Sequence, residues 1–200
     1  MSDPVQLEIP DWRMTIEEFL AWYEAQPKEA GRFELWDGHV VCKQGPAGSM
    51  NAERAKHRRI KSLLFVALRD AIRVADIEAN VEPDGATVLL PGGQSVEPDA
   101  LVYVGEPVSD DSITIPNPVI VCEVLSPSTA KTDMSTKLEG YFTLSSIQHY
   151  LIADPDKPLI IVHSRGSGNL LSTRLVADPG SHLRLDPPGL DIDLSEILGR

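Results

Sequence analysis

The chain has 200 residues, 42% hydrophobic and 24% charged, which is typical of one globular domain with a sizeable core. The formal net charge of −12 argues against a protein that grips nucleic acid through an overall basic surface, and only residues 54–61 are locally basic. No run approaches the roughly 18 consecutive apolar residues of a membrane span. The N-terminus lacks the pattern of a secretory signal, so we expect a cytoplasmic protein without membrane contact.

Cysteine usage excludes two further classes. Cys42 and Cys122 are the only cysteines, and their spacing fits neither a zinc site nor a disulfide scaffold. A reducing compartment is consistent with this usage.

The first 50 residues predict a helix and then a hairpin. Residues 15–25 begin with Thr15, and Glu18 follows three positions later, which is the pattern of a capping box. In residues 32–43, two strand-like runs flank the pair Asp37-Gly38, which favours a tight turn. A loop is expected at residues 44–49, which contain Gly and Pro.

The remainder of the chain alternates helical and strand-like patterns. Apolar residues recur every three or four positions over residues 51–74, which predicts a long amphipathic helix, and a second helix is expected over 131–144. Strands are expected at 77–82, 86–90, 99–104, 118–125, 149–153, 158–164 and, more weakly, near 170–176. We expect a loop at 91–98 and a short terminal element at 191–198, after the sequence DPPG. This order indicates a mixed α/β or α+β domain.

One carboxylate, Glu123, lies within the apolar run PVIVCEVLSPST at residues 118–129. Both alternating sets of positions in VIVCEVL are apolar, which predicts a central strand covered on both faces. Burial of a lone carboxylate costs several kcal/mol unless something pairs with it. Glu123 therefore either has a cationic partner or is held in place for chemistry.

Asp99 is the natural companion of Glu123, because it begins the strand ahead of the one that contains Glu123. If the two strands are neighbours, their carboxylates can meet, and a divalent cation would relieve the repulsion. Oxygen ligands suit Mg²⁺ or Mn²⁺ better than zinc. The alternative is that Asp99 caps a turn after Pro98 and that Glu123 faces a solvent cleft or an arginine.

Lys137 is a candidate partner for Glu123. Asp133, Lys137 and Tyr141 follow one line along the second predicted helix, and the apolar neighbours of Lys137 place its stem near the core. Its ammonium could neutralise Glu123, and it could orient a water or stabilise charge on a phosphate. The alternative is a surface pair of Asp133 and Lys137, which contributes little to stability.

Other polar residues could contribute. The hydroxyl groups of Ser126, Ser128 and Thr129 could cap the second helix or donate to a phosphate. His57 follows the buried stripe of the long helix, so it is either a core residue or a group at a cleft edge. Glu34, in the first strand, either faces solvent or shares the face of the other acids. A Gly-rich phosphate loop, a G-x-S-x-G elbow and an H-E-x-x-H motif are absent from the sequence.

Taken in order, these segments resemble a known family. FELWDGHVV, a helix with His57, EPDALVYV, VCEVLSPST, D-x-x-x-K-x-x-x-Y and HYLIADP, from about residue 14 to about residue 165, are similar to the Uma-two (Uma2) family of restriction endonucleases. That family belongs to the PD-(D/E)XK nuclease superfamily. The resemblance implies a single restriction-endonuclease-like domain over residues 1–200. Its mixed central sheet would be flanked by helices, with a C-terminal extension at 166–200.

The resemblance also implies a set of site residues. Asp99, after Pro98, matches the PD element and Glu123 the (D/E), with the main-chain carbonyl of Val124 as a further metal ligand. The superfamily lysine is replaced by Leu125, so Lys137 from the following helix would take its place. The remaining candidates are Glu34 and His57 as catalytic residues and Ser126, Ser128, Thr129 and Tyr141 as substrate contacts.

The implied activity is hydrolysis of phosphodiester bonds in DNA, assisted by Mg²⁺ or Mn²⁺. The acidic balance predicts weak nonspecific affinity for DNA, and specificity would come from a partner or from homodimerisation. The alternative is a nuclease fold that has become a catalytically inactive binding or scaffold protein. Glycoside hydrolysis by paired carboxylates fits poorly with an aromatic content of 6%.

Overall fold

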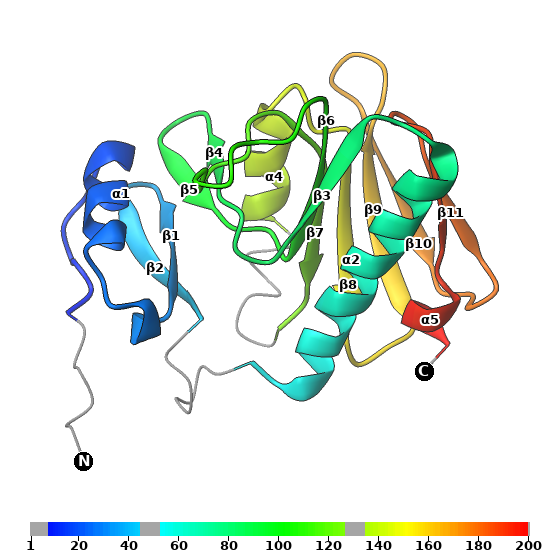
Figure 1. The fold of residues 1–200 in the computed structure, drawn as a ribbon, viewed down its shortest axis with the longest axis horizontal. Helices are drawn as coiled ribbons and strands as arrows, with labels where there is room; N and C mark the ends of the chain where they lie inside the picture. Colours follow the sequence, from blue (N-terminus) through cyan, green and yellow to red (C-terminus); the bar gives the residue numbers. More distant parts are fainter. Residues whose placement is uncertain (1–7, 45–52, 127–134, 200) are drawn as a thin grey trace. The chain divides into compact units, whose positions relative to one another are not determined.

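The computed structural model describes residues 8–44, 53–126 and 135–199 (Figure 1). The chain forms two compact units. One consists of Met1–Arg54 and Leu89–Val96, and the other of Ala55–Val88 and Glu97–Arg200. A single domain over the whole chain stays a prediction.

The first unit contains a four-stranded sheet in the order β2-β1-β5-β4. Helix α1 (Ile16–Glu24) packs on it through Phe19, which contacts an apolar cluster that includes Phe33 and Leu35. Thr15 and Glu18 form the predicted capping box, each accepting a hydrogen bond from the backbone N–H of the other. The unit also contains the short 3₁₀ helix η1 (Lys28–Ala30), and its strands are β1 (Arg32–Trp36), β2 (His39–Gln44), β4 (Val88–Leu90) and β5 (Gln94–Val96).

The predicted hairpin of this unit is confirmed, and one predicted loop is wrong. Strands β1 and β2 pair in antiparallel fashion around Asp37 and Gly38, which have φ angles of 49° and 77°. These positive φ angles are the conformation that such a pair favours. The segment 91–98 is not entirely a loop, because β5 lies within it and pairs with β1 through Leu35 and Ser95. A three-residue strand has too few alternations to be recognised in the sequence.

The second unit is built on a six-stranded mixed sheet in the order β10-β9-β8-β7-β6-β3. Every neighbouring pair is antiparallel except β7 and β8, which are parallel. The predicted central strand, β7, lies between β6 and β8. The strands are β3 (Ala79–Pro83), β6 (Ala100–Val104), β7 (Pro118–Val124), β8 (His149–Asp154), β9 (Leu159–Arg165) and β10 (Leu171–Val176).

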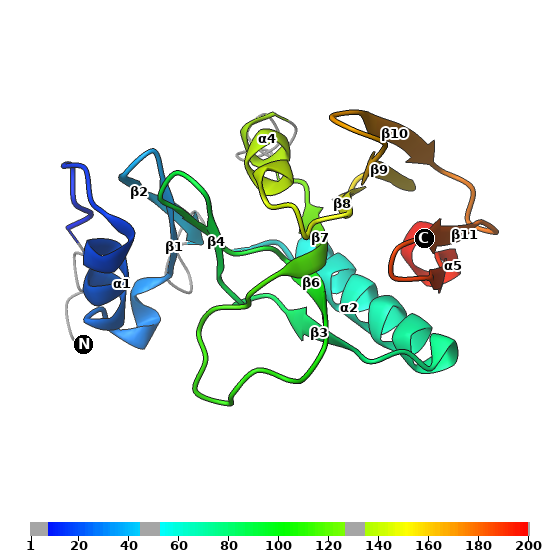
Figure 2. The ribbon, with the colours of Figure 1, turned by 90° about the horizontal axis from the view of Figure 1, so that it is seen from above.

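Two helices cover opposite sides of this sheet. Figure 2 shows α4 (Thr136–Thr143) on one side and α2 (Ala55–Ala75) on the other. The predicted helices 51–74 and 131–144 correspond to α2 and α4, although residues 51–52 and 131–134 lie outside the described part of the chain. Among the described residues, none of the helices is long and apolar enough to cross a membrane.

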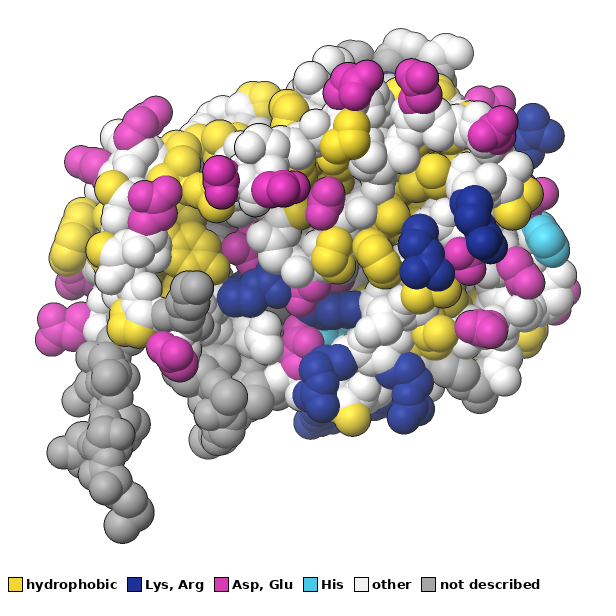
Figure 3. Space-filling view, in the orientation of Figure 1, with side chains coloured by type: hydrophobic (Ala, Val, Ile, Leu, Met, Phe, Trp, Pro, Cys, Tyr) yellow, Lys and Arg dark blue, Asp and Glu magenta, His cyan; other side chains and the backbone are white. Residues whose placement is uncertain are grey.

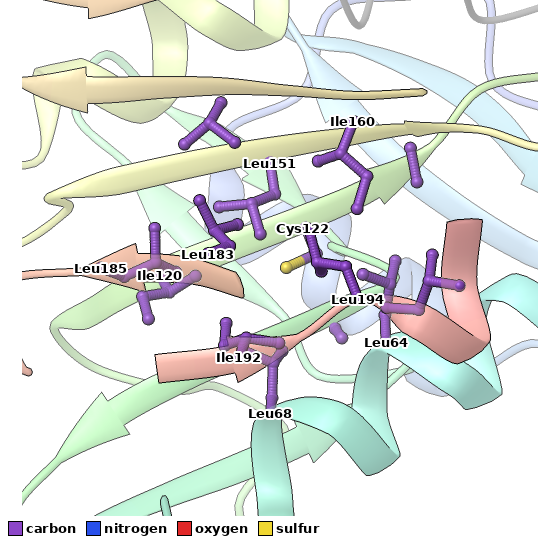
Figure 4. Close-up of a cluster of buried hydrophobic side chains, with 14 of the residues drawn as sticks. Leu64, Leu68, Ile120, Cys122, Leu151, Ile160, Leu183, Leu185, Ile192 and Leu194 are labelled. Carbon is purple, nitrogen blue, oxygen red and sulfur yellow. The ribbon is translucent and has the colours of Figure 1, made fainter. Parts of the chain in front are cut away.

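The main hydrophobic core lies between α2 and the sheet (Figure 4). Leu64 and Leu68 of α2 contribute to it, as do Ile120 and Cys122 of β7 and Leu151 of β8. Each fully buried aliphatic side chain of this kind contributes roughly 1.5–3 kcal/mol. Because side chains alternate across a strand, Cys122 and Val124 face this core, and Glu123 between them faces the side of α4.

The C-terminal region is more structured than the sequence predicts. A single short element was expected after DPPG, but this sequence is the turn of a hairpin between β11 (His182–Leu185) and β12 (Leu190–Asp193). Helix α5 (Ser195–Leu198) follows the hairpin. Leu183 and Leu185 of the hairpin belong to the same hydrophobic core as Leu64 and Leu68 of α2. Each strand of the hairpin has only four residues, which is too short for a clear alternating pattern in the sequence.

Candidate active site

Glu123 lies in a buried hydrogen-bonded cluster on the α4 side of the sheet. Its side chain is 3% exposed, and its Oε1 accepts hydrogen bonds from Lys137 Nζ at 2.9 Å and from Tyr141 Oη at 2.7 Å. Both donors come from α4, where Lys137 and Tyr141 are one turn apart and so point from the same face of the helix. Lys137 is itself 4% exposed, so this is a buried ion pair with one additional hydroxyl donor.

This cluster explains how an apolar strand tolerates a carboxylate. The burial of the two charged groups is compensated because each has the other as a partner at hydrogen-bond distance. An ammonium beside Glu123 was one of two interpretations of the sequence, and the structure places the Lys137 ammonium there. The alternative partner for Lys137, Asp133, lies outside the described residues.

Asp99 is held by a different lysine. Its side chain is 2% exposed, and its Oδ1 lies 2.9 Å from Nζ of Lys61, a residue of α2. The same Nζ donates to Oδ2 of Asp84 at 2.8 Å. The other oxygen of Asp99, Oδ2, accepts a hydrogen bond from the backbone N–H of Val124 at 2.8 Å. Asp99 therefore links the start of β6, the end of β7 and helix α2.

The backbones of Asp99 and Glu123 lie side by side. Asp99 N–H donates to the Cys122 carbonyl at 2.9 Å, and Ala100 is the register partner of Cys122. Burial raises the pKa of the Cys122 thiol, and the negative charges of Glu123 and Asp99 raise it further. The thiol thus lies within electrostatic reach of both carboxylates.

His57 contacts the same region from α2. Its Nε2 lies 2.7 Å from the Val124 carbonyl oxygen and 4.0 Å from Asp99 Oδ2. Because a carbonyl can only accept, Nε2 carries the proton and donates to Val124. His57 therefore lies beside the acids and is not a purely apolar core residue. It contacts the Val124 carbonyl, which the family resemblance predicts to be a metal ligand.

The donor set suits a hard divalent cation. Asp99, Glu123 and the Val124 carbonyl offer only oxygen atoms, which is the set that Mg²⁺ and Mn²⁺ prefer. An oxygen of Asp84 also lies within 4.8 Å of an oxygen of Asp99. Each of the two buried carboxylates contacts an ammonium group, which compensates its charge in the metal-free protein. By this chemistry, the residues fit a divalent ion.

The remaining predicted site residues lie in other surroundings. Glu34, in the first unit, is buried and accepts a hydrogen bond from the indole N–H of Trp36 at 3.0 Å, so it does not face solvent as its alternation suggested. Ser126 follows β7 and is partly exposed. Ser128 and Thr129 lie outside the described residues. The catalytic, metal-binding and substrate-binding roles of all these residues stay predictions.

Two charged residues of this site were missed in the sequence. Lys61 is four residues after His57 and three before Leu64, so a lysine within the buried stripe of the long helix was a signal that could have been read. Asp84 follows β3 directly. Its proximity to Lys61 depends on how β3 packs against α2, which local sequence patterns do not specify.

The mixed sheet, its helices on both faces and its buried acids define a restriction-endonuclease-like fold. A solved structure supports this assignment: a "putative nuclease belonging to DUF820" from Anabaena variabilis has a TM-score of 0.70 to this chain. The match covers 93% of this chain and 98% of the other at 17% identity, which shows the fold alone. No curated protein matches the chain.

A family model places the chain more closely. The model of Uma2, described as "Putative restriction endonuclease", matches residues 16–195. The chain therefore belongs to the Uma2 family, as its sequence resemblance predicted.

Proposed function

We propose that this protein is a nuclease that hydrolyses phosphodiester bonds in DNA with Mg²⁺ or Mn²⁺. One observation carries the proposal: two buried carboxylates, Asp99 and Glu123, lie on adjacent backbones, and each has its own lysine. Membership of a family described as restriction endonucleases supports phosphodiester hydrolysis as the reaction.

Asp99, Glu123 and the Val124 carbonyl would hold the divalent ion. When bound, such an ion supplies an acidified water as nucleophile and stabilises the charge that develops on the phosphate. His57 would fix the orientation of the Val124 carbonyl through its hydrogen bond at 2.7 Å. In the same way, Tyr141 would keep the Glu123 carboxylate in one rotamer, because its hydroxyl donates to Oε1 from a fully buried position.

Lys137 would act as the catalytic lysine. Its ammonium lies 2.9 Å from Glu123 Oε1, so a group held beside this carboxylate would be within its reach. A positive charge there stabilises an attacking hydroxide or a phosphate oxygen. Glu34 stays a predicted catalytic residue, as the family resemblance implies.

Substrate binding would rely on local charge. The chain carries a net charge of −12, yet Lys and Arg side chains gather along α2 (Figure 3). Such a stripe offers counter-charge to a phosphate backbone, while the acidic remainder keeps nonspecific affinity low. Ser126, Ser128 and Thr129 would donate hydrogen bonds to the substrate, and homodimerisation would supply specificity.

A cleavage screen tests the proposal. The wild-type protein is incubated with single-stranded, duplex and supercoiled DNA and with RNA, each with Mg²⁺, Mn²⁺ or EDTA. We expect metal-dependent cleavage of DNA that is lost in Glu123→Gln and in Lys137→Met. Arg174→Met is the matched control, because Arg174 is an exposed residue of β10 and lies outside the basic stripe of α2. Absence of cleavage under every condition would favour the inactive scaffold. Equal cleavage by wild type, Glu123→Gln and Lys137→Met would exclude these two residues from catalysis.

A further inference from the structure

Lys61 occupies an unusual position for a lysine. Its side chain is 7% exposed, and its Nζ lies between two carboxylates, 2.8 Å from Asp84 Oδ2 and 2.9 Å from Asp99 Oδ1. On one side lies Asp99, which is 2% exposed, and on the other Asp84, which is 20% exposed. The ammonium therefore bridges a buried acid and a more accessible acid.

This bridge has the geometry of a cation held between two oxygen ligands. Two carboxylates whose oxygens lie within 4.8 Å repel each other unless a positive charge stands between them. Lys61 supplies that charge from within the chain.

The surroundings of Asp84 favour the approach of a cation. Asp84 lines a hollow of about 330 Å³, and Glu82 and Asp110 also line it. Ser109 and Ser112 add hydroxyl groups to the same wall, which otherwise consists of small and apolar residues. An acidic hollow attracts divalent cations, so Asp84 lies where such an ion would arrive.

We infer that Lys61 is a built-in counter-ion that holds Asp84 and Asp99 together in the metal-free protein and competes with the divalent ion for them. This inference rests on the proposed metal site. On metal binding, the Lys61 ammonium gives up its contact with Asp99, and Asp84 becomes an additional oxygen ligand. Lys61 is then a positioning residue that determines the affinity of the site for the divalent ion.

Removal of the charge at position 61 should act oppositely on stability and on metal affinity. Lys61→Met keeps the length of the side chain but leaves two acids without their shared cation. We expect the Tm of the metal-free variant to fall and its Mn²⁺ dissociation constant to decrease about tenfold, because a charge within a few ångströms no longer opposes the ion. Lys61→Arg retains the charge and should bind Mn²⁺ with nearly wild-type affinity.

The experiment measures Mn²⁺ binding directly, by the electron paramagnetic resonance signal of the free ion, in full-length protein without DNA. Lys56→Met is the matched control on the same helix and should leave both Tm and Mn²⁺ affinity close to wild type. Asp84→Asn should weaken Mn²⁺ binding. A purely structural lysine would lower Tm without any change in Mn²⁺ affinity, so unchanged or weaker binding by Lys61→Met overturns the inference.

Two results separate this inference from the proposed function. If wild type binds Mn²⁺, Asp99→Asn does not, and Lys61→Met binds no better than wild type, the inference fails while the metal site stands. If neither wild type nor Lys61→Met binds Mn²⁺, the proposed metal site fails and the inference fails with it. Tighter binding by Lys61→Met supports the inference even in a protein that cleaves no DNA.

Discussion

The buried pair of Glu123 and Lys137 gives the sharpest stability prediction. Both side chains are at most 4% exposed, and their atoms lie 2.9 Å apart. Lys137→Met leaves a buried carboxylate without its counter-charge, for which the cost is about 3–5 kcal/mol. Because Tyr141 still donates to Glu123 at 2.7 Å, we expect a loss near the lower end, about 3 kcal/mol in the free energy of unfolding.

A double-mutant cycle isolates the interaction of the pair. Glu123→Gln, Lys137→Met and the double variant are unfolded with urea in buffer containing EDTA, and circular dichroism follows the transition. Each single change removes one charge of the pair and leaves the other buried, whereas the double change removes both charges. We therefore expect the double variant to be more stable than the sum of the single losses predicts, with a coupling of at least about 1.5 kcal/mol.

An exposed pair in the same unit is the control for this cycle. Lys56 and Asp156 form an ion pair with side chains 38% and 59% exposed, so their coupling should be below about 1 kcal/mol. Additive losses at Glu123 and Lys137, within about 0.5 kcal/mol, would refute the argument that burial makes the pair interdependent. A changed urea m-value would instead indicate an altered denatured or native state.

Three further predictions concern stability in urea unfolding experiments. Thr15→Ala removes the N-cap hydroxyl that accepts from Glu18 and should cost about 1 kcal/mol, whereas an unchanged midpoint would contradict the capping box. Leu68→Ala opens a cavity beneath α2 and should lower the free energy of unfolding by about 2–5 kcal/mol. A loss below about 1 kcal/mol would show that the core is not tightly packed around Leu68. Burial lowers the pKa of His149 below its usual 6.5, so the unfolded chain takes up a proton first as the pH falls, and stability declines below about pH 6.5. His149→Gln should reduce this decline, and an identical pH profile for both proteins would exclude His149 as a contributor.

The sequence was informative wherever a residue broke a local pattern. Glu123 stood out because every neighbour in its strand was apolar, and Lys137 because its helical neighbours were apolar too. The helix cap at Thr15 and the turn at Asp37 were equally local, and the structure contains both. Such features could be predicted because their physical causes lie within a few residues of the chain.

Contacts between distant segments could not be predicted in this way. The pairing of Lys61 with Asp84 and Asp99 depends on how α2 lies against β3 and β6, and local sequence patterns do not encode that packing. The same reasoning explains the missed strand β5, which has only three residues and pairs with β1 across more than 50 positions. The sequence suggested one lysine for two acids, whereas the structure gives each acid its own.

The proposed function depends most on a divalent ion bound by Asp99, Glu123 and the Val124 carbonyl. Crystals of the full-length protein soaked in Mn²⁺ test this directly through anomalous diffraction. We predict a strong anomalous peak in contact with oxygen atoms of all three residues, and its loss in Asp99→Asn. A fully soaked crystal with no peak there, or with peaks only at acids elsewhere on the surface, would contradict the account.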